Sequence, residues 1–365
     1  MKILHCSDLH LESSYNVVGK ENYRLLKDEA LEIFSYLCQY AKENEIEAVL
    51  ICGDLFDSLN VRKSAIKFVF QQVEACKGIT FYYIQGNHDA KLNLNLPEKP
   101  ENFQIIGESF MRFDVDDLVS IGGVSLSKQN VDTFYEEIEF DENKFNIFML
   151  HADTALGNHD PSQYSNVELS KLKGKKINYL ALGHIHKRGE GKLDDRGIYC
   201  NSGNCGNYGF GEESERGFVV IDVQGKTINV ARHIVPLKRN FVVLSVDISK
   251  FGSEKIFDEA IARVLFNQRR EDFVRVKLVG YFDESFDKRI DYLTTKYKDR
   301  FFHFEIRDES KLDINLEKIK EEKLSLKYEF LNQVFSSKEL SEDVKNKIAY
   351  AGIQALRGED ITIWN

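Results

Sequence analysis

The stretch AVLICGDLFD, residues 48–57, decides the fold of this chain. Its first five residues are all apolar, which is typical of a strand buried on both faces, and glycine and aspartate follow where that strand would end. Similar stretches occur at residues 2–10, KILHCSDLH, and at residues 80–89, TFYYIQGNHD. Residues 23–42 and 61–73, which lie between them, have the apolar period of amphipathic helices. This β-α-β-α-β order predicts a parallel sheet that is covered by helices on both faces.

The later part of the chain continues this pattern and then changes character. Residues 1–237 form the expected first domain, because Pro236 and the basic residues after it interrupt the pattern. Residues 240–312 have the β-α-β-α-β order of a small α+β domain, and residues 313–365 are mostly helical and highly charged. The predicted fold class is therefore α/β, with β-sheets flanked by helices, followed by a small α+β domain and C-terminal helices. Further strands of the first domain are expected at residues 144–150, 179–182, 217–223 and 227–233, the last two as a hairpin.

The composition limits what the protein binds and where it acts. Acidic residues outnumber basic residues by 59 to 49, which gives a formal net charge of −10, and most of this charge lies before residue 240. Such a chain is not a general polyanion binder, because non-specific DNA affinity comes mainly from Lys and Arg. The six cysteines form no CxxC pair, no apolar stretch is long enough for a membrane span, and no signal-peptide core precedes Asp8. We therefore expect a cytoplasmic protein with no membrane partner.

Side chains that can bind metal ions follow five of the predicted strands. In an open α/β sheet, such strand ends meet at one crevice. Carboxylates together with several imidazoles suit Mn, Fe or Zn better than Ca or Mg, and we expect Mn. The set is too large for one ion, whereas two ions bridged by a carboxylate form the usual clamp for displacement at phosphorus. The side chains are those of Asp8, His10, Asp54, Asn87, His151, His184 and His186.

The order of these motifs is DxH, GDxxD, GNH[DE], a single histidine and GHxH. It resembles the pattern of the calcineurin-like metallophosphoesterase superfamily, and the resemblance extends over residues 1–235. Membership would imply two divalent metal ions that share one bridging carboxylate, Asp54. The remaining ligands would divide into Asp8, His10 and His186 for one ion, and Asn87, His151 and His184 for the other.

Other residues are expected to act beside the two ions. The family resemblance implies that His88 binds no metal and instead stabilises the transition state or protonates the leaving oxygen, with Asp89 orienting its ring. The spacing of Asp57 favours a hydrogen bond to a metal-bound histidine. Lys187 and Arg188 follow the GHIH segment, where they either contact a phosphate backbone or lie on a solvated face.

Within the superfamily, the segments KILHCSDLHL, GDLFD and LALGHIHKR resemble the SbcD-type DNA repair exonucleases, and in particular the YhaO-like branch. This resemblance implies a DNA exonuclease or endonuclease that acts in repair and that works with an SMC-like ATPase. It also implies that residues 240–312 form a capping domain and, by analogy with related nucleases, that the protein forms a homodimer. The C-terminal segment, residues 313–365, would be the docking region for the ATPase.

Two other functions stay open at this point. One is a metallophosphoesterase for a small substrate, such as a nucleotide, a cyclic nucleotide or a phosphoprotein, which the acidic balance favours. Against a phosphoprotein, Ser58 follows GDLFD where Ser/Thr protein phosphatases have an arginine. The other is a non-catalytic scaffold on DNA ends. A scaffold of this kind would be expected to lose metal ligands, whereas this chain has the whole set.

Overall fold

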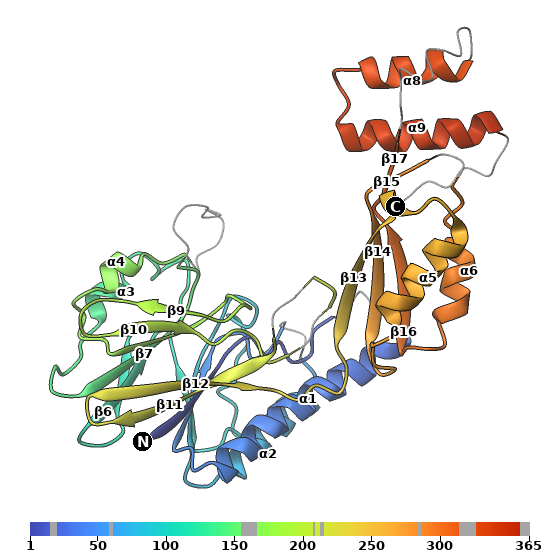
Figure 1. Ribbon diagram of the computed structural model, residues 1–365. Coiled ribbons are helices and arrows are strands. Elements are labelled where there is room, and N and C mark those ends of the chain that lie inside the picture. The colour runs from blue at the N-terminus through green and yellow to red at the C-terminus, as the bar shows by residue number, and fades with distance from the viewer. Residues whose placement is uncertain are drawn as a thin grey trace. The chain divides into compact units, whose positions relative to one another are not determined.

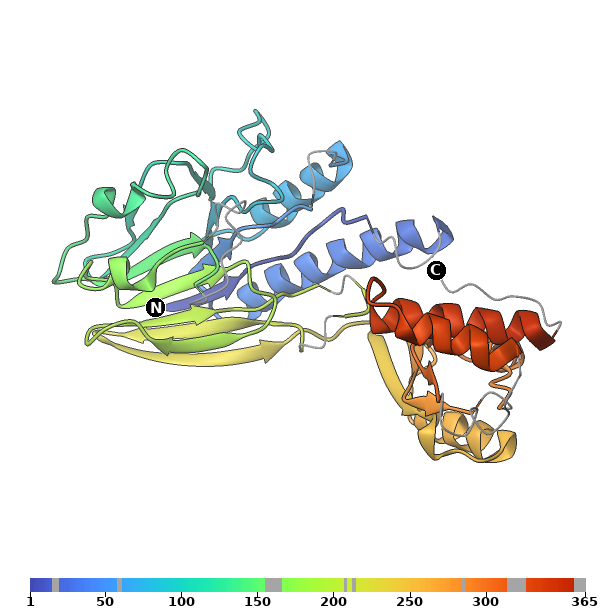
Figure 2. The same cartoon turned by 90° about the horizontal axis from the view of Figure 1, so that it is seen from above.

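The computed structural model describes residues 1–14, 20–57, 61–154, 166–206, 209–211, 215–283, 286–313 and 326–357. The chain divides into two compact units, Met1–Lys238 and Arg239–Asn365, which Figures 1 and 2 show from two directions. None of the helices in the described ranges is both long enough and apolar enough to cross a membrane.

The first sheet of unit 1 contains the N-terminal strand in its interior. Strand β1 pairs in parallel with β2 on one side and antiparallel with β11 on the other, and β2, β3 and β4 continue the parallel arrangement. The predicted hairpin is present as β11 and β12. The order across the sheet is β12 (Thr227–Ile234), β11 (Gly217–Gln224), β1 (Lys2–Cys6), β2 (Ala48–Cys52), β3 (Thr80–Ile84) and β4 (Phe103–Ile106).

A second six-stranded sheet completes unit 1. Its four inner strands run parallel, and an antiparallel strand forms each edge. The order is β5 (Met111–Asp114), β6 (Val119–Gly123), β7 (Phe145–His151), β8 (Tyr179–Gly183), β10 (Ile198–Asn201) and β9 (Gly189–Lys192).

The two sheets pack face to face, which corrects one prediction from the sequence. Helices α1 (Lys20–Glu43) and α2 (Lys63–Glu74) cover only one face of the first sheet, where Leu4 and Val49 point towards them. The alternate side chains, such as Leu50, pack instead against the second sheet. A buried strand is apolar on both faces whether a helix or another sheet covers it, so the strand pattern alone did not distinguish the two arrangements.

Short helices cover the outer face of the second sheet. They are α3 (Phe134–Glu137) and α4 (Leu169–Leu172), whose apolar side chains meet Phe148 and Leu180. Unit 1 is thus an α/β structure of two packed sheets flanked by helices, as the predicted fold class required.

Unit 2 contains a smaller parallel sheet with helices on one face. Strands β13 (Phe241–Asp247), β14 (Phe273–Val279) and β16 (His303–Asp308) form the sheet, and α5 (Glu254–Leu265) and α6 (Ile290–Tyr297) pack against it. The two short strands β15 (Tyr281–Phe282) and β17 (Lys311–Leu312) also pair in parallel.

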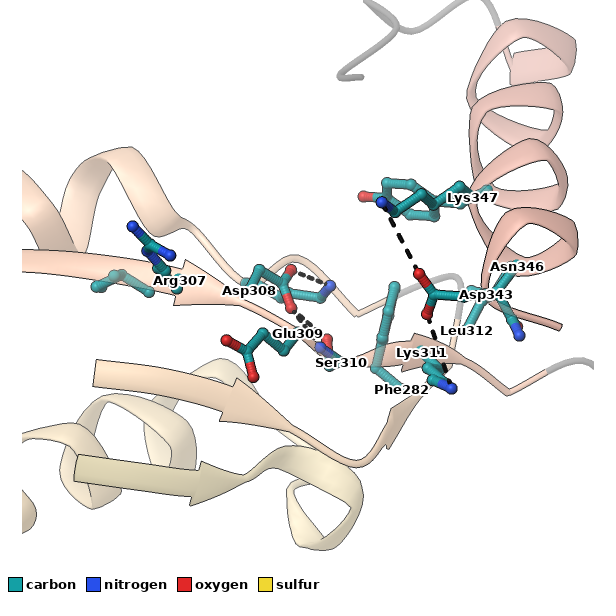
Figure 3. A pocket seen from close by; sticks show the side chains of 13 residues that line it. Phe282, Arg307, Asp308, Glu309, Ser310, Lys311, Leu312, Asp343, Asn346 and Lys347 are labelled. Atoms are coloured by element: carbon teal, nitrogen blue, oxygen red, sulfur yellow. Dashed lines mark hydrogen bonds and ion pairs between the residues drawn. The ribbon is translucent and has the colours of Figure 1, made fainter. Parts of the chain in front are cut away.

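Two further helices, α8 (Leu326–Ser336) and α9 (Glu342–Arg357), lie side by side in the same unit (Figure 1). Helix α9 is attached through apolar contacts and through Asp343, which lies 3.9 Å from Lys311 and 3.8 Å from Lys347 (Figure 3). Of the predicted C-terminal segment 313–365, residues 314–325 and 358–365 lie outside the described residues.

Candidate metal centre

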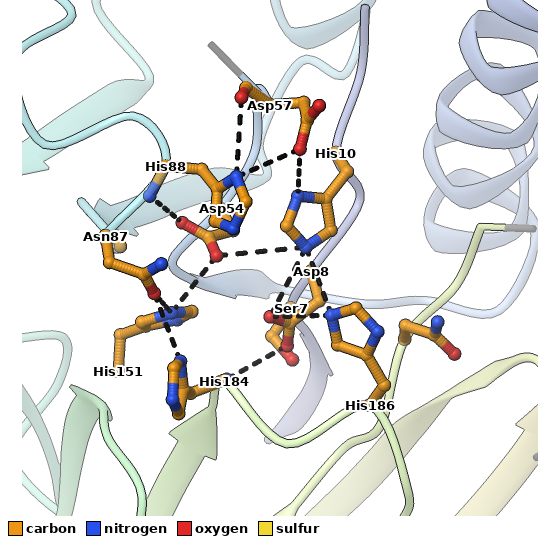
Figure 4. Close-up of polar contacts among 12 residues, drawn as sticks. Ser7, Asp8, His10, Asp54, Asp57, Asn87, His88, His151, His184 and His186 are labelled. Carbon is orange, nitrogen blue, oxygen red and sulfur yellow. Dashed lines mark hydrogen bonds and ion pairs between the residues drawn. The ribbon is translucent and has the colours of Figure 1, made fainter. Parts of the chain in front are cut away.

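Strand ends from both sheets meet at the candidate site without space for extra side chains (Figure 4). A Cβ atom built on Gly183, at the end of β8, would lie 1.9 Å from the carbonyl oxygen of Cys52. A Cβ atom on Gly53 would lie 2.1 Å from Nδ1 of His151, and one on Gly86 would lie 2.2 Å from Oδ1 of Asp54. Glycine is therefore required at these positions so that ligand-bearing segments of the two sheets can approach one another.

Four of the predicted ligands have left-handed backbone conformations. The φ angles of Asp8, His10, Asp54 and His184 are 51°, 40°, 48° and 89°. This region is unfavourable for residues other than glycine and persists only where surrounding contacts fix it. The amides of Asp8 and His10 donate to the carbonyl oxygens of Gly53 and Asp54, at 3.1 and 2.9 Å. The DxH and GDxxD segments thus hold each other in the conformation that turns their side chains into the site.

The first cluster contains Asp8, His10 and His186. Oδ1 of Asp8 lies 3.8 Å from Nε2 of His10 and 3.8 Å from Nε2 of His186, and these two nitrogens are 3.1 Å apart. The other oxygen of Asp8 accepts a hydrogen bond from the amide of His184 at 3.0 Å. The three side chains offer ligand atoms that all lie within 4.8 Å of one another.

The second cluster contains Asp54, Asn87, His151 and His184. Oδ1 of Asn87 lies 3.0 Å from Nε2 of His151 and 3.1 Å from Nδ1 of His184. Asp54 lies between the clusters, because its Oδ2 is 3.3 Å from His151 Nε2 and 3.8 Å from His10 Nε2. The carbonyl oxygen of Cys52 contacts Nδ1 of His151 at 2.9 Å and thereby orients the ring. The structure therefore brings together all seven side chains that the sequence singled out as ligands.

The electrostatics of the two clusters fit bound cations. Asp8 and Asp54 are 0% and 2% exposed, so two carboxylates of like charge share a site with little water. Burial opposes ionisation of Asp54, but the neighbouring His151 and His10 lower its pKa overall. Burial also opposes protonation of His151, but Asp54 raises the pKa of that ring to about 10. In the protein alone, protons on the histidines balance the carboxylates, and divalent ions can replace those protons.

Asp57 links the first cluster to His88 at the open side of the site. One carboxylate oxygen, Oδ1, lies 3.0 Å from Nδ1 of His10 and 3.0 Å from Nδ1 of His88. The hydrogen bond to Asp57 raises the pKa of His88 to about 9, and the side chain of His88 is 44% exposed. His88 is therefore mainly protonated at neutral pH in the protein alone and is open to solvent. The contact of Asp57 with a predicted metal-binding histidine is the one that its spacing suggested.

Asp89 contacts different groups from those we predicted. It is fully buried, and its two oxygens accept hydrogen bonds from the amides of Gly86, at 2.8 Å, and Phe56, at 3.1 Å. The carboxylate thus joins the GNHD turn to the GDLFD segment, whereas Asp57 contacts the ring of His88. The prediction that Asp89 orients His88 is corrected accordingly. Burial and the nearby Asp54 raise the pKa of Asp89.

A buried carboxylate two residues after His10 was not singled out in the sequence. The side chain of Glu12 has no exposed surface, and Arg62 donates to it from Nη2 at 2.6 Å and from Nε at 2.8 Å. Lys27 of α1 lies 3.5 Å away, and Glu12 itself has a φ of 70°. Glu12 therefore joins the end of the ligand segment to α1 and to Arg62, the residue before α2. Its partners are distant in sequence, so no local pattern identifies it.

The predicted phosphate contacts beside GHIH differ in their surroundings. Arg188 donates to Glu190 at 2.6 Å, which reduces its capacity to bind a phosphate, whereas Lys187 is exposed. His5, the strand residue next to the site, is buried and contacts the hydroxyl of Tyr179 at 2.9 Å. Burial lowers the pKa of His5 to about 3, so this ring is neutral and structural.

Residues 1–188 match the family model of the calcineurin-like phosphoesterases. The chain belongs to this family. The resemblance inferred from the motifs is thus confirmed, and with it a phosphoesterase whose family uses a centre of two metal ions.

Several curated relatives of this calcineurin-like phosphoesterase are nucleases or repair proteins by name. The chain is 25% identical over 361 residues to the DNA double-strand break repair protein Mre11 of Sulfolobus acidocaldarius, which covers 92% of this chain and 89% of that protein. It is 25% identical over 317 residues to the SbcD component of the nuclease SbcCD of Staphylococcus saprophyticus, covering 76% and 78%. It is also 29% identical over 204 residues to the uncharacterized metallophosphoesterase YhaO of Bacillus subtilis, covering 52% and 49%.

Proposed function

We propose that this phosphoesterase is a two-metal-dependent phosphodiesterase that cleaves DNA as an exonuclease or endonuclease during repair. The observation that carries the proposal is the convergence of seven ligand side chains on two adjacent clusters that share Asp54, with a protonated histidine beside them. The relatives named for DNA repair and for nuclease activity support DNA as the substrate. All six cysteines are free and buried thiols, which supports a cytoplasmic location.

The ligand sets divide between the two ions as the clusters do. Asp54 would bridge both ions, and the mixture of carboxylate, amide and imidazole donors favours Mn, although Fe and Zn also suit it. When bound, the two ions would neutralise the attacked phosphate and lower the pKa of a water molecule in the site towards neutrality. The proposed sets are Asp8, His10 and His186 for one ion, and Asn87, His151 and His184 for the other.

The chain's own proton donor in this proposal is His88. Its ring is exposed at the mouth of the site, and the Asp57 carboxylate accepts a hydrogen bond from Nδ1, which leaves Nε2 free to face a substrate. The protonated ring would give its Nε2 proton to the leaving oxygen of the phosphodiester. Asp57 is a positioning residue in this scheme, and Asp89 acts one step further away by fixing the turn that carries His88. Lys187 is the proposed contact for a phosphate further along the strand.

The experiment that tests this function is Mn-dependent digestion of end-labelled linear duplex DNA, run beside a small chromogenic phosphodiester. Asp54→Asn is the matched variant, because it removes the bridging charge while keeping nearly the same shape. Cleavage of both substrates by the wild-type protein and of neither by the variant would support a nuclease. Cleavage of the small diester alone would instead favour the small-substrate phosphoesterase that the acidic charge of the chain suggests. No cleavage of either would favour the scaffold.

We also propose that helix α9 docks an SMC-like ATPase. Three apolar residues on this helix are exposed, Val344 by 40%, Ile348 by 36% and Leu356 by 43%, and the first two are one helical turn apart. Such a stripe is suited to another amphipathic helix. The double substitution Val344→Glu and Ile348→Glu should abolish co-purification of the ATPase, whereas Lys338→Glu, before α9, should not. Unchanged co-purification in the double variant would contradict this docking site.

A further inference from the structure

The connection between α5 and β14, residues 266–272, exposes a phenylalanine. Phe266 is 75% exposed, which is more than any other large apolar side chain in the described ranges. It follows Leu265, which is fully buried in the core of unit 2. Leaving an aromatic ring of this size in water forgoes about 1.5–3 kcal/mol of burial energy, so the ring has no stabilising role where it lies. An exposed ring of this kind is available to a ligand.

Arginine and lysine side chains surround this ring. Arg300 donates from Nη2 to the carbonyl oxygens of Leu265, at 2.9 Å, and of Phe266, at 3.1 Å, and so brings the turn between α6 and β16 against the end of α5. Within the described ranges, neither Arg263 nor Arg270 has an acidic group at ion-pair distance. We call this region the Phe266 surface; it consists of Arg263, Phe266, Arg269, Arg270, Lys298 and Arg300.

Helix capping accounts for only part of this positive charge. Cations near a helix C-terminus complement the helix dipole, which explains Arg300 and also Arg263, in the last turn of α5. Arg269 and Arg270 come after the helix has ended and do not cap it. Arg269 contacts Glu271 and Asp272 at 3.7 and 4.0 Å, which leaves a net positive charge on the surface.

The opposite end of the same unit is acidic. The hollow beside the N-terminus of α5 is lined by Glu254, Asp283, Asp287 and Asp313, together with the single cation Lys255. Charges in unit 2 are thus separated along the direction of α5, with positive charge at the end that also carries the exposed ring. This separation favours a polyanion at the Phe266 surface.

We propose that the Phe266 surface binds single-stranded nucleic acid. The exposed ring would stack on an unpaired base, and the arginines would neutralise the phosphates on either side of it. A single strand fits better than a duplex, because only an unpaired base offers a free face to the ring. The binding site lies outside the metal centre, and the proposal rests on the proposed function only for the identity of the nucleic acid as DNA.

The test is fluorescence anisotropy of a labelled oligothymidine with the full-length protein and no added metal ion. Phe266→Ser should weaken binding by about 5- to 100-fold, which is the range expected for the loss of one stacked base. Arg270→Ala should weaken binding and reduce the slope of log affinity against log salt by about one. The matched controls are Tyr281→Ser, a 56% exposed aromatic residue beyond the other end of β14, and Lys255→Ala at the acidic end of α5. Both controls should bind as the wild type does.

Three results would overturn the proposal. These are wild-type affinity in Phe266→Ser, equal losses in the two control variants, or displacement of oligothymidine by polyglutamate at the same charge concentration as by unlabelled oligothymidine. The last result would identify the surface as one for acidic proteins. Hydrolysis of the small phosphodiester should be unchanged in Phe266→Ser, because the ring is not part of the metal centre. Loss of the proposed nuclease activity and loss of this binding are therefore separate outcomes.

Discussion

The buried charges of the two units are arranged in opposite ways. In unit 1, the carboxylates of Asp8 and Asp54 have the same sign, lie almost without water and depend on histidines for compensation. In unit 2, the ammonium group of Lys288 is paired with the carboxylate of Asp308, and Phe282 lies 3.3 Å below the same cation. Like charges that are kept together cost stability and mark a site for a ligand, whereas opposite charges form a structural contact. The contrast identifies the chemistry of the molecule without reference to any motif.

The backbone shows the same contrast. In unit 1, left-handed conformations of residues other than glycine occur at metal ligands such as Asp8 and His184. In the described part of unit 2, Arg289 is the one such residue, and it lies in a turn directly before α6. Strain is thus concentrated where seven side chains must converge.

The largest expected effect is on turnover, from a residue that contributes little to the fold. His88→Ala should lower kcat on a phosphodiester by about 10²- to 10⁴-fold, because it removes the proposed proton donor. Metal content and melting temperature should stay close to those of the wild type, since the ring is 44% exposed and belongs to neither proposed ligand set. Steady-state kinetics and metal analysis on the same preparation check this prediction. Turnover near the wild-type value would remove His88 from the mechanism.

The next effect is on stability alone. Lys288→Met should cost unit 2 about 3–5 kcal/mol, because it leaves the buried carboxylate of Asp308 without its cation. Urea unfolding followed by hydrogen exchange in peptides of residues 273–312 measures this loss. The control is Lys288→Met combined with Asp308→Leu, which should recover most of the stability because no lone charge stays buried. A double variant no better than the single one would show that the pair matters through packing rather than charge.

Glu12 tests whether an opposite-charge contact next to the ligands behaves like the one in unit 2. Glu12→Gln should destabilise unit 1 by about 1–3 kcal/mol, since Arg62 loses the charge of its bidentate partner. Burial opposes ionisation of Glu12, but Arg62 and Lys27 lower its pKa overall. The stabilisation is therefore fully present above the unfolded-state pKa of about 4.3 and is lost as the pH falls through the lower folded-state value. Urea unfolding of both proteins between neutral and acidic pH should show the difference narrowing only on the acidic side.

The smallest effect concerns the protonation of His88. Asp57→Asn should lower the pKa of His88 from about 9 towards 6.5, because the charged partner of Nδ1 becomes neutral. In the wild type, a raised folded-state pKa contributes stability that is complete below the unfolded value and is lost as the pH rises through about 9. NMR titration of the ring in metal-free protein measures the shift directly. An unchanged pKa would mean that Asp54, rather than Asp57, holds the proton on this ring.

The sequence was sufficient for the ligands because of where they occur along the chain. Asp8, Asp54 and Asn87 each follow a strand, and parallel strands have their carboxyl ends at a common edge. The edge strands were missed for a physical reason: β5 is largely exposed, and β9, with the sequence GEGK, has no apolar alternation that could mark it. Neither strand has a face to bury, so no pattern in the sequence distinguishes them from loops.

Side-chain direction was the part of the site that the sequence did not determine. Asp89 is adjacent to His88 in the chain, yet its carboxylate points to the amides of Gly86 and Phe56. Asp57 is more than thirty residues away from His88 and makes the contact instead. Spacing indicates which residues reach a site, whereas the tertiary structure decides which of them touch.

The position of β1 in the interior of its sheet has a consequence for biosynthesis. This strand carries Asp8 and His10 beyond its end, but its antiparallel neighbour is β11, and the amino group of Met1 donates to the carbonyl oxygen of Val223. On a ribosome, the first residues to emerge must therefore wait for nearly the whole of unit 1 before their sheet closes. His184 and His186 emerge late as well, so a nascent chain that ends before them has an incomplete set of ligands. The enzyme thus stays inactive until the translation of its catalytic unit is nearly complete.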